Sequence, residues 1–201
     1  MQPFDRQPHL DKGRGGSGLD VVGQLKRQDE KALQALMDQY GDYLLRTACL
    51  LLKDRQAAEE AVQDAFVTAY YKIGQLQDPL KLKGWLTRIV VNRCRMRQRT
   101  RDWKRLFSFA RMEPFLEDVS EPGPEQSLML ELRNERLSDA VRQLAYPYRE
   151  AITLYYFNEM NIEEMSEQLE CNRNTIKARL SRGRAQLKRM LEEGADHDGQ
   201  R

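Results

Sequence analysis

The chain has 201 residues, of which 40% are hydrophobic and 32% charged, with 33 basic against 31 acidic side chains. These values are typical of one or two small globular domains and exclude wholesale disorder. The longest apolar run, Ala48 to Leu52, is too short to span a bilayer, and the first residues lack the apolar segment of a signal peptide. We therefore expect a cytoplasmic protein without membrane insertion.

Residues 1–22 are predicted to be a flexible tail, because their glycines cluster and no helical periodicity appears. From Asp29 the spacing becomes helical. Apolar residues then recur at intervals of three and four positions: Leu33, Leu36, Met37, Tyr40, Leu44, Ala48, Leu51. This pattern predicts a long amphipathic helix.

A second helix is predicted from about Asp54 to Gly74, followed by a loop over residues 75–84. A third helix opens at Trp85. Positions 93 and 97 would continue its apolar stripe but are arginines. We expect this helix to leave the core there and to meet an anion.

Residues 106–127 combine prolines with acidic side chains and are predicted to be a flexible linker. The linker separates two predicted domains, residues 23–105 and residues 128–192, and residues 193–201 form a second tail. The predicted fold class is all-α.

The C-terminal domain contains shorter predicted helices. Pro147 suits the first turn of one of them, and Asn161 with Glu164 suits the capping box of the next. A three-residue turn separates that short helix from a basic helix, whose N-cap is predicted at Asn172 or Asn174. A short helix, a tight turn and a basic helix predict a helix-turn-helix.

The basic residues are concentrated in two blocks. Residues 81–105 hold ten lysines and arginines against one acid, and residues 173–189 hold seven against none. A single basic block is typical of a solvated helix face, but two blocks that each adjoin an apolar stripe favour binding to nucleic acid.

The start of the basic helix would enter the major groove of DNA. Its candidate contacts with bases are Arg173, Asn174, Thr175, Lys177, Ala178, Ser181 and Arg182. Arg184 and later basic residues are expected on phosphates. Gly183 lowers the stability of this helix relative to alanine. Its presence predicts that the backbone closely approaches a neighbouring group at this position.

The chain shows no catalytic or metal-binding pattern, so we predict neither enzymatic activity nor a cofactor. Cys49, Cys94 and Cys171 are far apart in apolar-periodic stretches and are interpreted as reduced thiols. The two histidines lie in polar end segments with no cysteine nearby.

Two segments resemble bacterial RNA polymerase sigma factors, and more closely the extracytoplasmic-function (ECF) group of the sigma-70 family. They are residues 58–66 (AEEAVQDAF) and residues 85–92 (WLTRIVVN), followed by the helix-turn-helix. The resemblance implies a region 2 helical bundle and a region 4 helix-turn-helix that bind core RNA polymerase and promoter DNA. It also implies control by an anti-sigma factor.

The resemblance assigns roles to particular residues. Gln63, Asp64 and Phe66 would bind core polymerase, although Phe66 also fits plain core packing. The loop before Trp85 and Asn92 would capture a flipped base of the −10 element, although Asn92 could equally be a helix-interior hydrogen-bonder. The single-strand backbone would be held by basic residues: Lys81, Lys83, Arg88, Arg93, Arg97. The −35 element would be read by the basic helix: Lys177, Ala178, Ser181, Arg182, Arg184.

Two other functions remain open at this point. A two-domain regulator would bind duplex DNA through its helix-turn-helix alone, with the N-terminal helices as a sensor. Such a sensor would not need the first basic block. An RNA-binding protein would be expected to carry aromatic platforms, which the sequence lacks.

Overall fold

The computed structural model describes residues 17–108 and 128–198, and all regular elements in these ranges are helical. The predicted all-α fold with two helical units is thus confirmed. The N-terminal unit comprises α1 (Ser17–Lys26), α2 (Glu30–Leu52), α3 (Arg55–Lys72), two 3₁₀ turns at Ile73–Gln75 and Pro79–Lys81, and α4 (Leu82–Ser108). The C-terminal unit comprises α5 (Leu128–Gln143), α6 (Tyr146–Ile152), a π-helical turn at Thr153–Phe157, α7 (Ile162–Leu169) and α8 (Arg173–Asp198).

The helices α2, α3 and α4 pack against one another around a shared apolar core. Asp29 and Asp54 cap the N-termini of α2 and α3, each accepting a hydrogen bond from a backbone N–H of the first turn. Leu36, Leu44 and Leu86 are fully buried between the three helices. The core fixes α4 along one side of the unit, with one stripe facing inward.

Helix α1 is an addition to the prediction, because it begins at Ser17, inside the segment predicted as a tail. Val21, Val22 and Leu25 are buried, and the helix packs on α2. Its ten residues include glycines, which lower helix propensity, so its stability comes from this packing. The α4 helix runs to Ser108, past the predicted start of the linker. Predictions for residues 1–16, 109–127 and 199–201 lie outside the described residues.

The C-terminal unit contains the predicted helix-turn-helix in α7 and α8. Asn161 accepts from the backbone N–H of Glu164, and the Glu164 carboxylate accepts from the backbone N–H of Asn161, so the predicted capping box is confirmed. Pro147 lies in the first turn of α6, as predicted. The π-helical turn was not predicted.

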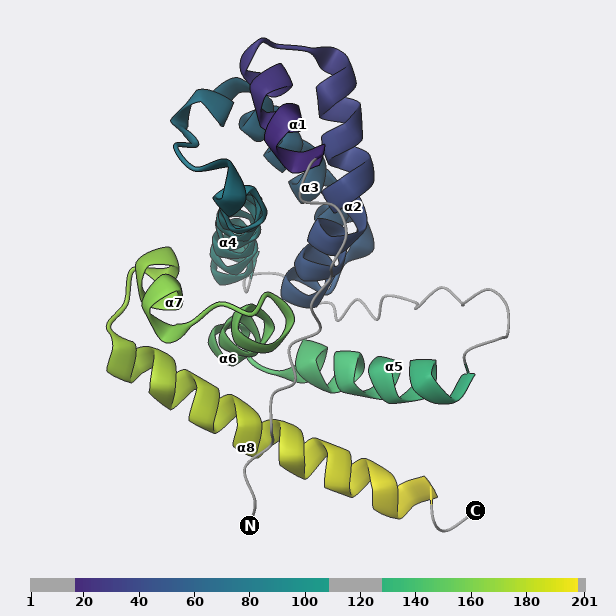
Figure 1. Cartoon of the computed structure of the whole chain (residues 1–201). Coiled ribbons are helices and arrows are strands. Elements are labelled where there is room, and N and C mark those ends of the chain that lie inside the picture. The colour runs from purple at the N-terminus through teal and green to yellow at the C-terminus, as the bar shows by residue number, and fades with distance from the viewer. Residues whose placement is uncertain (1–16, 109–127, 199–201) are drawn as a thin grey trace.

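The two units lie against each other (Figure 1). Helix α2 contacts α5, α6 and the π-helical turn, and α7 lies beside α4 in Figure 1. In the part of the chain that the structure describes, no helix is both long and apolar enough to cross a membrane.

Candidate nucleic-acid interface

Helix α8 is held at its start by Asn172, one of the two predicted N-cap residues. Its Oδ1 accepts hydrogen bonds from the Thr175 backbone N–H at 2.8 Å and from Thr175 Oγ1 at 3.0 Å. Glu163 of α7 forms an ion pair with Arg173 at 3.2 Å. These contacts fix the angle at which α8 leaves the turn.

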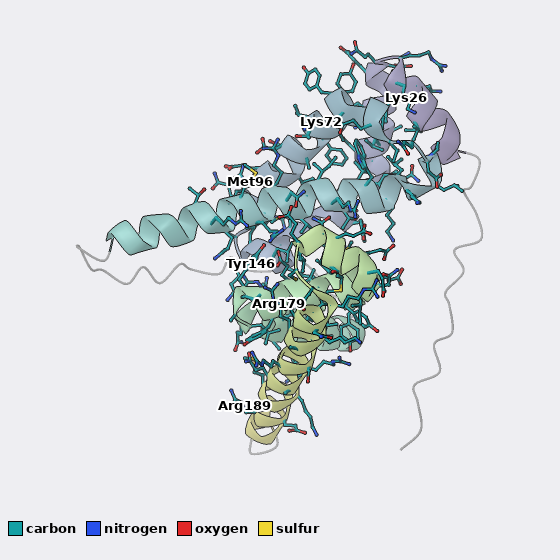
Figure 2. The ribbon with its side chains drawn as sticks, turned by 90° about the vertical axis from the view of Figure 1, so that its left-hand side faces the viewer. Lys26, Lys72, Met96, Tyr146, Arg179 and Arg189 are labelled. Atoms are coloured by element: carbon teal, nitrogen blue, oxygen red, sulfur yellow. The ribbon has the colours of Figure 1, made fainter. Side chains whose placement is uncertain are left out.

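The two faces of α8 differ sharply. Ile176, Leu180 and Leu187 are buried against the rest of the unit. The predicted DNA-contacting residues lie on the other side, where all are exposed except the half-buried Thr175: Arg173, Asn174, Lys177, Ala178, Ser181, Arg182, Arg184. Figure 2 shows Arg179 and, towards the end of the same helix, Arg189. The structure therefore brings the predicted −35 residues together on one exposed cationic face.

Helix α8 approaches α6 closely at Gly183. A Cβ atom at this position would lie 2.9 Å from Cγ1 of Ile152 and 3.3 Å from its Cδ1. The close approach predicted from the sequence is therefore to α6, and it sets the depth at which α8 sits. A groove between these helices is lined by Tyr148, Thr175, Ala178, Arg179 and Arg182, among others.

The first basic block is distributed around α4 and the turn before it. Lys81, Lys83, Arg88 and Asn92 are exposed, and the Lys83 ammonium lies 4.5 Å from the centroid of the Tyr43 ring. Arg88 pairs with Glu167 of α7 at 2.9 Å, and Asn92 Oδ1 accepts a hydrogen bond from Gln168 Nε2 at 3.0 Å. These two predicted −10 residues thus face the C-terminal unit.

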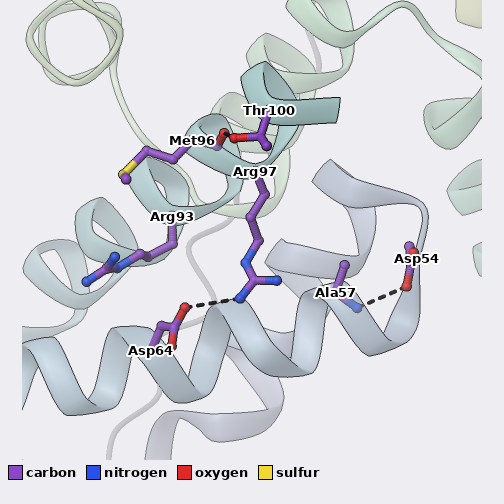
Figure 3. Close-up of a pocket in the computed structure, with 7 residues that line it drawn as sticks. All are labelled: Asp54, Ala57, Asp64, Arg93, Met96, Arg97 and Thr100. Atoms are coloured by element: carbon purple, nitrogen blue, oxygen red, sulfur yellow. Dashed lines mark hydrogen bonds and ion pairs between the residues drawn. The ribbon is translucent and has the colours of Figure 1, made fainter. Parts of the chain in front are cut away.

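Arg93 and Arg97 lie on another side of α4, facing α3. Arg93 donates to Thr68 Oγ1 at 2.7 Å. Arg97 pairs with Glu60 at 2.6 Å and with Asp64 at 3.0 Å, across a groove of about 500 Å³ (Figure 3). The anion that the sequence predicted for this part of the helix is, in this arrangement, the pair of carboxylates on α3.

The three predicted polymerase-binding residues do not share one environment. Gln63 and Asp64 are exposed on α3. Phe66 is 4% exposed and belongs to the core of the N-terminal unit. Only the first two side chains are available on the surface, whereas Phe66 fixes the position of α3.

The interface between the units contains charged residues that sequence reasoning missed. Arg149 is buried, and its Nη2 donates to the Leu51 carbonyl at 2.9 Å while its Nη1 donates to the Leu144 carbonyl at 2.9 Å. Glu150 is also buried and lies 3.4 Å from Nε of Arg95. The signal that could have found them is their position on the apolar face of α6, next to Ala151 and Ile152.

Burial changes the titration of groups at this interface. It raises the pKa of Glu150, and the positive charge of Arg95 opposes this only in part. Burial, together with the charge of Glu150, raises the pKa of Tyr146, which lies below α4 in Figure 2. In the N-terminal core, burial raises the pKa of the Cys94 thiol to about 12, which agrees with an unreactive thiol.

Comparisons with known proteins agree with this geometry. Residues 36–104 match the family model "Sigma-70 region 2", and residues 134–187 match "Sigma-70, region 4". The ECF RNA polymerase sigma factor SigW of Bacillus subtilis is 29% identical over 177 residues, covering 85% of this chain and 94% of SigW. The RNA polymerase sigma-H factor of Pseudomonas aeruginosa is 23% identical over 180 residues, covering 86% and 92% of the two chains.

Two solved structures share the fold. The sigma factor RpoE of Bartonella quintana, in complex with the anti-sigma factor NepR, has a TM-score of 0.61 and 28% identity, covering 79% of this chain and 98% of RpoE. CnrH in complex with the cytosolic domain of CnrY has a TM-score of 0.57 and 22% identity, covering 88% and 97%. Since the two sigma-70 models occur in this order and together match more than half of the sequence, the chain belongs to the sigma-70 family of RNA polymerase sigma factors, and its similarity to SigW agrees with the ECF group.

Proposed function

We propose that this protein binds core RNA polymerase through the exposed face of α3 and directs it to promoters through two DNA contacts. The α8 helix reads the −35 element as duplex, and α4 captures bases of the −10 element. The observation that carries this proposal is the exposed cationic face of α8, presented by a capped helix-turn-helix and accompanied by a second cationic helix in a separate unit.

The residue assignments follow from chemistry at each surface. The guanidinium of Arg182 can donate to both acceptors of a guanine in the major groove, and small Ala178 lets α8 lie deep. The amide of Asn92 can bind the polar edge of an unstacked base. Basic side chains on α4 and on the turn before it hold the strand by its phosphates: Lys81, Lys83, Arg88, Arg93, Arg97. Gln63 and Asp64 contact the polymerase.

An anti-sigma factor is a further part of the proposal. RpoE of Bartonella quintana, 28% identical to this chain, was solved in complex with the anti-sigma factor NepR. We extend that mode of control to this protein. A partner of this kind would compete with core polymerase, so its addition should reduce transcription without any change in the sigma factor itself.

Reconstitution with core RNA polymerase tests the function directly. Run-off transcription on a library of genomic fragments should yield discrete products that depend on both the sigma factor and the core enzyme. A duplex-only regulator would retard the same fragments without polymerase and give no product, and that result would contradict the proposal.

Arg182→Ala should reduce transcription at a promoter found in this way while core binding is unchanged. Loss of a contact between arginine and guanine costs about 1–3 kcal/mol. Arg46→Ala is the matched control, because Arg46 is an exposed arginine on α2 and the same charge is lost. Equal transcription by both variants would remove Arg182 from the −35 contact.

Asn92→Ala should relax base preference at one position of the −10 element, with about 1–3 kcal/mol at stake by analogy with other base contacts. Transcription from promoters carrying each of the four bases at each −10 position measures this preference. If the wild type uses all four bases equally at every position, Asn92 reads none of them.

A further inference from the structure

One face of α4 is covered by α7 of the C-terminal unit. Gln168 Nε2 donates to Asn92 Oδ1 at 3.0 Å and to the Arg88 carbonyl at 3.4 Å. Glu167 pairs with the Arg88 guanidinium at 2.9 Å. One turn further on, Arg95 donates to the carbonyls of Gln168 at 3.3 Å and Leu169 at 3.4 Å, at the C-terminal end of α7 where a cation is favoured.

A second group of contacts joins the units at α2. Asn158 Nδ2 donates to Tyr43 Oη at 2.8 Å and to Thr47 Oγ1 at 2.9 Å. The Tyr43 ring stacks on Phe157, with 5.7 Å between the ring centroids. Arg149 reaches the Leu51 carbonyl from the same side. The C-terminal unit is therefore held at both α2 and α4.

The interface combines apolar and polar contacts. Hydrogen bonds and ion pairs join the two units beside the Tyr43–Phe157 stack, and the buried apolar residues of both units form one continuous cluster. Asn158 Oδ1 is buried at the interface with no hydrogen-bond partner among the described residues. Water would bind this oxygen once the units separate, and this offsets part of the cost of opening.

We propose that this closed arrangement is a self-masking state, in which α7 competes with the −10 strand for α4 and Gln168 takes the place of a base on Asn92. The inference rests on the proposed role of Asn92. The interacting surface is the Arg88–Asn92–Arg95 face of α4, and its occupant is this chain's own α7.

The chemistry of the contact supports competition. Gln168 presents to Asn92 an amide N–H₂ group, the same donor that adenine and cytosine carry on their exocyclic nitrogens. Glu167 presents to Arg88 an anionic oxygen, as a phosphate would. Asn92 remains partly exposed, so α7 takes its acceptor without enclosing the side chain. A strand lying along this face must displace α7.

An opening variant can be built entirely in the C-terminal unit, leaving every residue of α4 intact. We choose the combination Asn158→Ala, Glu167→Lys and Gln168→Ala, which removes the contacts to Tyr43, Thr47, Arg88 and Asn92. The matched control is Glu163→Lys, on the same helix and with the same change of charge as Glu167→Lys, because Glu163 pairs with Arg173 inside its own unit.

A second opening variant guards against misfolding of the first. Arg95→Gln removes the donors to the end of α7 and the partner of Glu150 from the N-terminal side. It also removes a positive charge from α4, which by itself would weaken binding to DNA. Tighter binding by this variant could therefore not come from added charge.

Opening is measured by energy transfer between dyes on azido side chains at positions 46 and 143. Both positions are exposed and lie on α2 and α5, which contact each other across the interface. The full-length wild type and the Glu163→Lys control should show high transfer, and both opening variants should show lower transfer. Low transfer in the wild type, or unchanged transfer in both variants, overturns the closed state.

Competition is measured by fluorescence anisotropy with single-stranded DNA that carries all four bases at every position, without polymerase. If the wild type is open about one tenth of the time, the first opening variant should bind about tenfold more tightly. Arg95→Gln should also bind more tightly than the wild type, by a smaller factor because a positive charge is lost from α4. Lower energy transfer with unchanged affinity overturns the masking. An equal gain in the Glu163→Lys control also overturns it, because charge alone would then explain the gain.

Adding Asn92→Ala to the first opening variant separates this inference from the proposed function. Weaker binding of the strand supports both. If binding is unchanged and the difference in energy transfer is preserved, Asn92 does not read a base. Gln168 then does not take the place of a base on Asn92, although the closed arrangement of the two units still exists.

Discussion

Arg97 and Asp64 show that a side chain expected to bind another macromolecule can also form an ion pair within its own chain. The sequence placed Arg97 on DNA and Asp64 on polymerase, and in the structure they pair with each other at 3.0 Å. Glu60 is the second carboxylate on the same guanidinium. Any loss of function at Asp64 therefore has two possible origins, the polymerase contact or the position of α4.

Asp64→Asn and Glu60→Gln distinguish these origins. Each removes one of the two carboxylates that hold Arg97. If Asp64 contacts polymerase, Asp64→Asn should weaken core binding about tenfold, or about 1.4 kcal/mol, while Glu60→Gln leaves it unchanged. Titration of labelled core enzyme measures the two affinities. Equal weakening would assign the effect to Arg97 and α4.

Residue-scale predictions from the sequence were correct where the interaction is local. The Asn161 and Glu164 cap joins residues three positions apart, and the Asn172 cap of α8 is equally short in range. The partners of Arg149 and Glu150 could not be assigned from sequence. Their partners Leu51 and Arg95 are distant in the chain, and no local pattern encodes such a pairing.

At the scale of the element, the contact between α8 and α6 decides how far the recognition face stands out from the unit. Ile152 fills the space that a side chain at position 183 would need. Glycine lowers the helix propensity of α8 by about 1 kcal/mol relative to alanine, so its presence agrees with a packing requirement at this point.

Gly183→Ala should lower the free energy of unfolding by about 1 kcal/mol, because overpacking costs about 1–3 kcal/mol and the gain in helix propensity is about 1 kcal/mol. Gly41→Ala in α2 is the control. A Cβ there meets nothing within 4 Å, and the substitution should stabilise the protein by about 0.5–1 kcal/mol. Urea denaturation measures both. Stabilisation by Gly183→Ala would show that the Ile152 side chain on α6 moves aside at little cost in free energy.

The sequence predicted most of the longer helices from periodicity and turn residues. Besides the two short 3₁₀ turns, it missed α1 and the π-helical turn, for physical reasons. Helix α1 is short and contains glycine, so only its packing on α2 makes it stable. The π-helical turn at Thr153–Phe157 changes the helical period within one turn, which a stripe of constant period cannot reveal.

At the scale of the whole molecule, two domains were predictable from composition, but the contact between them was not. Its hydrogen bonds and ion pairs join polar residues of both units, and polar residues carry no periodic signature. The interface also places a titratable group, Glu150, where solvent is excluded. The association of the two units is therefore linked to pH.

Glu150→Gln should remove a pH dependence of stability that the wild type shows. Because burial raises the pKa of Glu150 above the ordinary 4.5, the folded state holds its proton over a range where the unfolded state has lost it. The contribution to stability is thus fully present below about pH 4.5 and is lost as pH rises through the raised value.

The measurement is the difference in free energy of unfolding between the wild type and Glu150→Gln, determined with urea at a series of pH values. Subtraction removes the carboxylates common to both proteins. The free energy of unfolding of the wild type should fall relative to that of Glu150→Gln as pH increases from about 4.5. The difference should then become constant above the raised pKa. A shift of the opposite sign would mean that Arg95 dominates over burial and lowers the pKa.

The widened turn before Asn158 sets the direction in which the Asn158 side chain points. The backbone N–H of Asn158 bonds to the Thr153 carbonyl at 3.0 Å, five positions back. One residue advances an α-helix by about 100°, so losing a single codon from this turn would swing the Asn158 amide away from Tyr43. Deletion of one residue from this turn would therefore weaken the contact between the two units, while the sequence of the DNA-reading helix α8 stays the same.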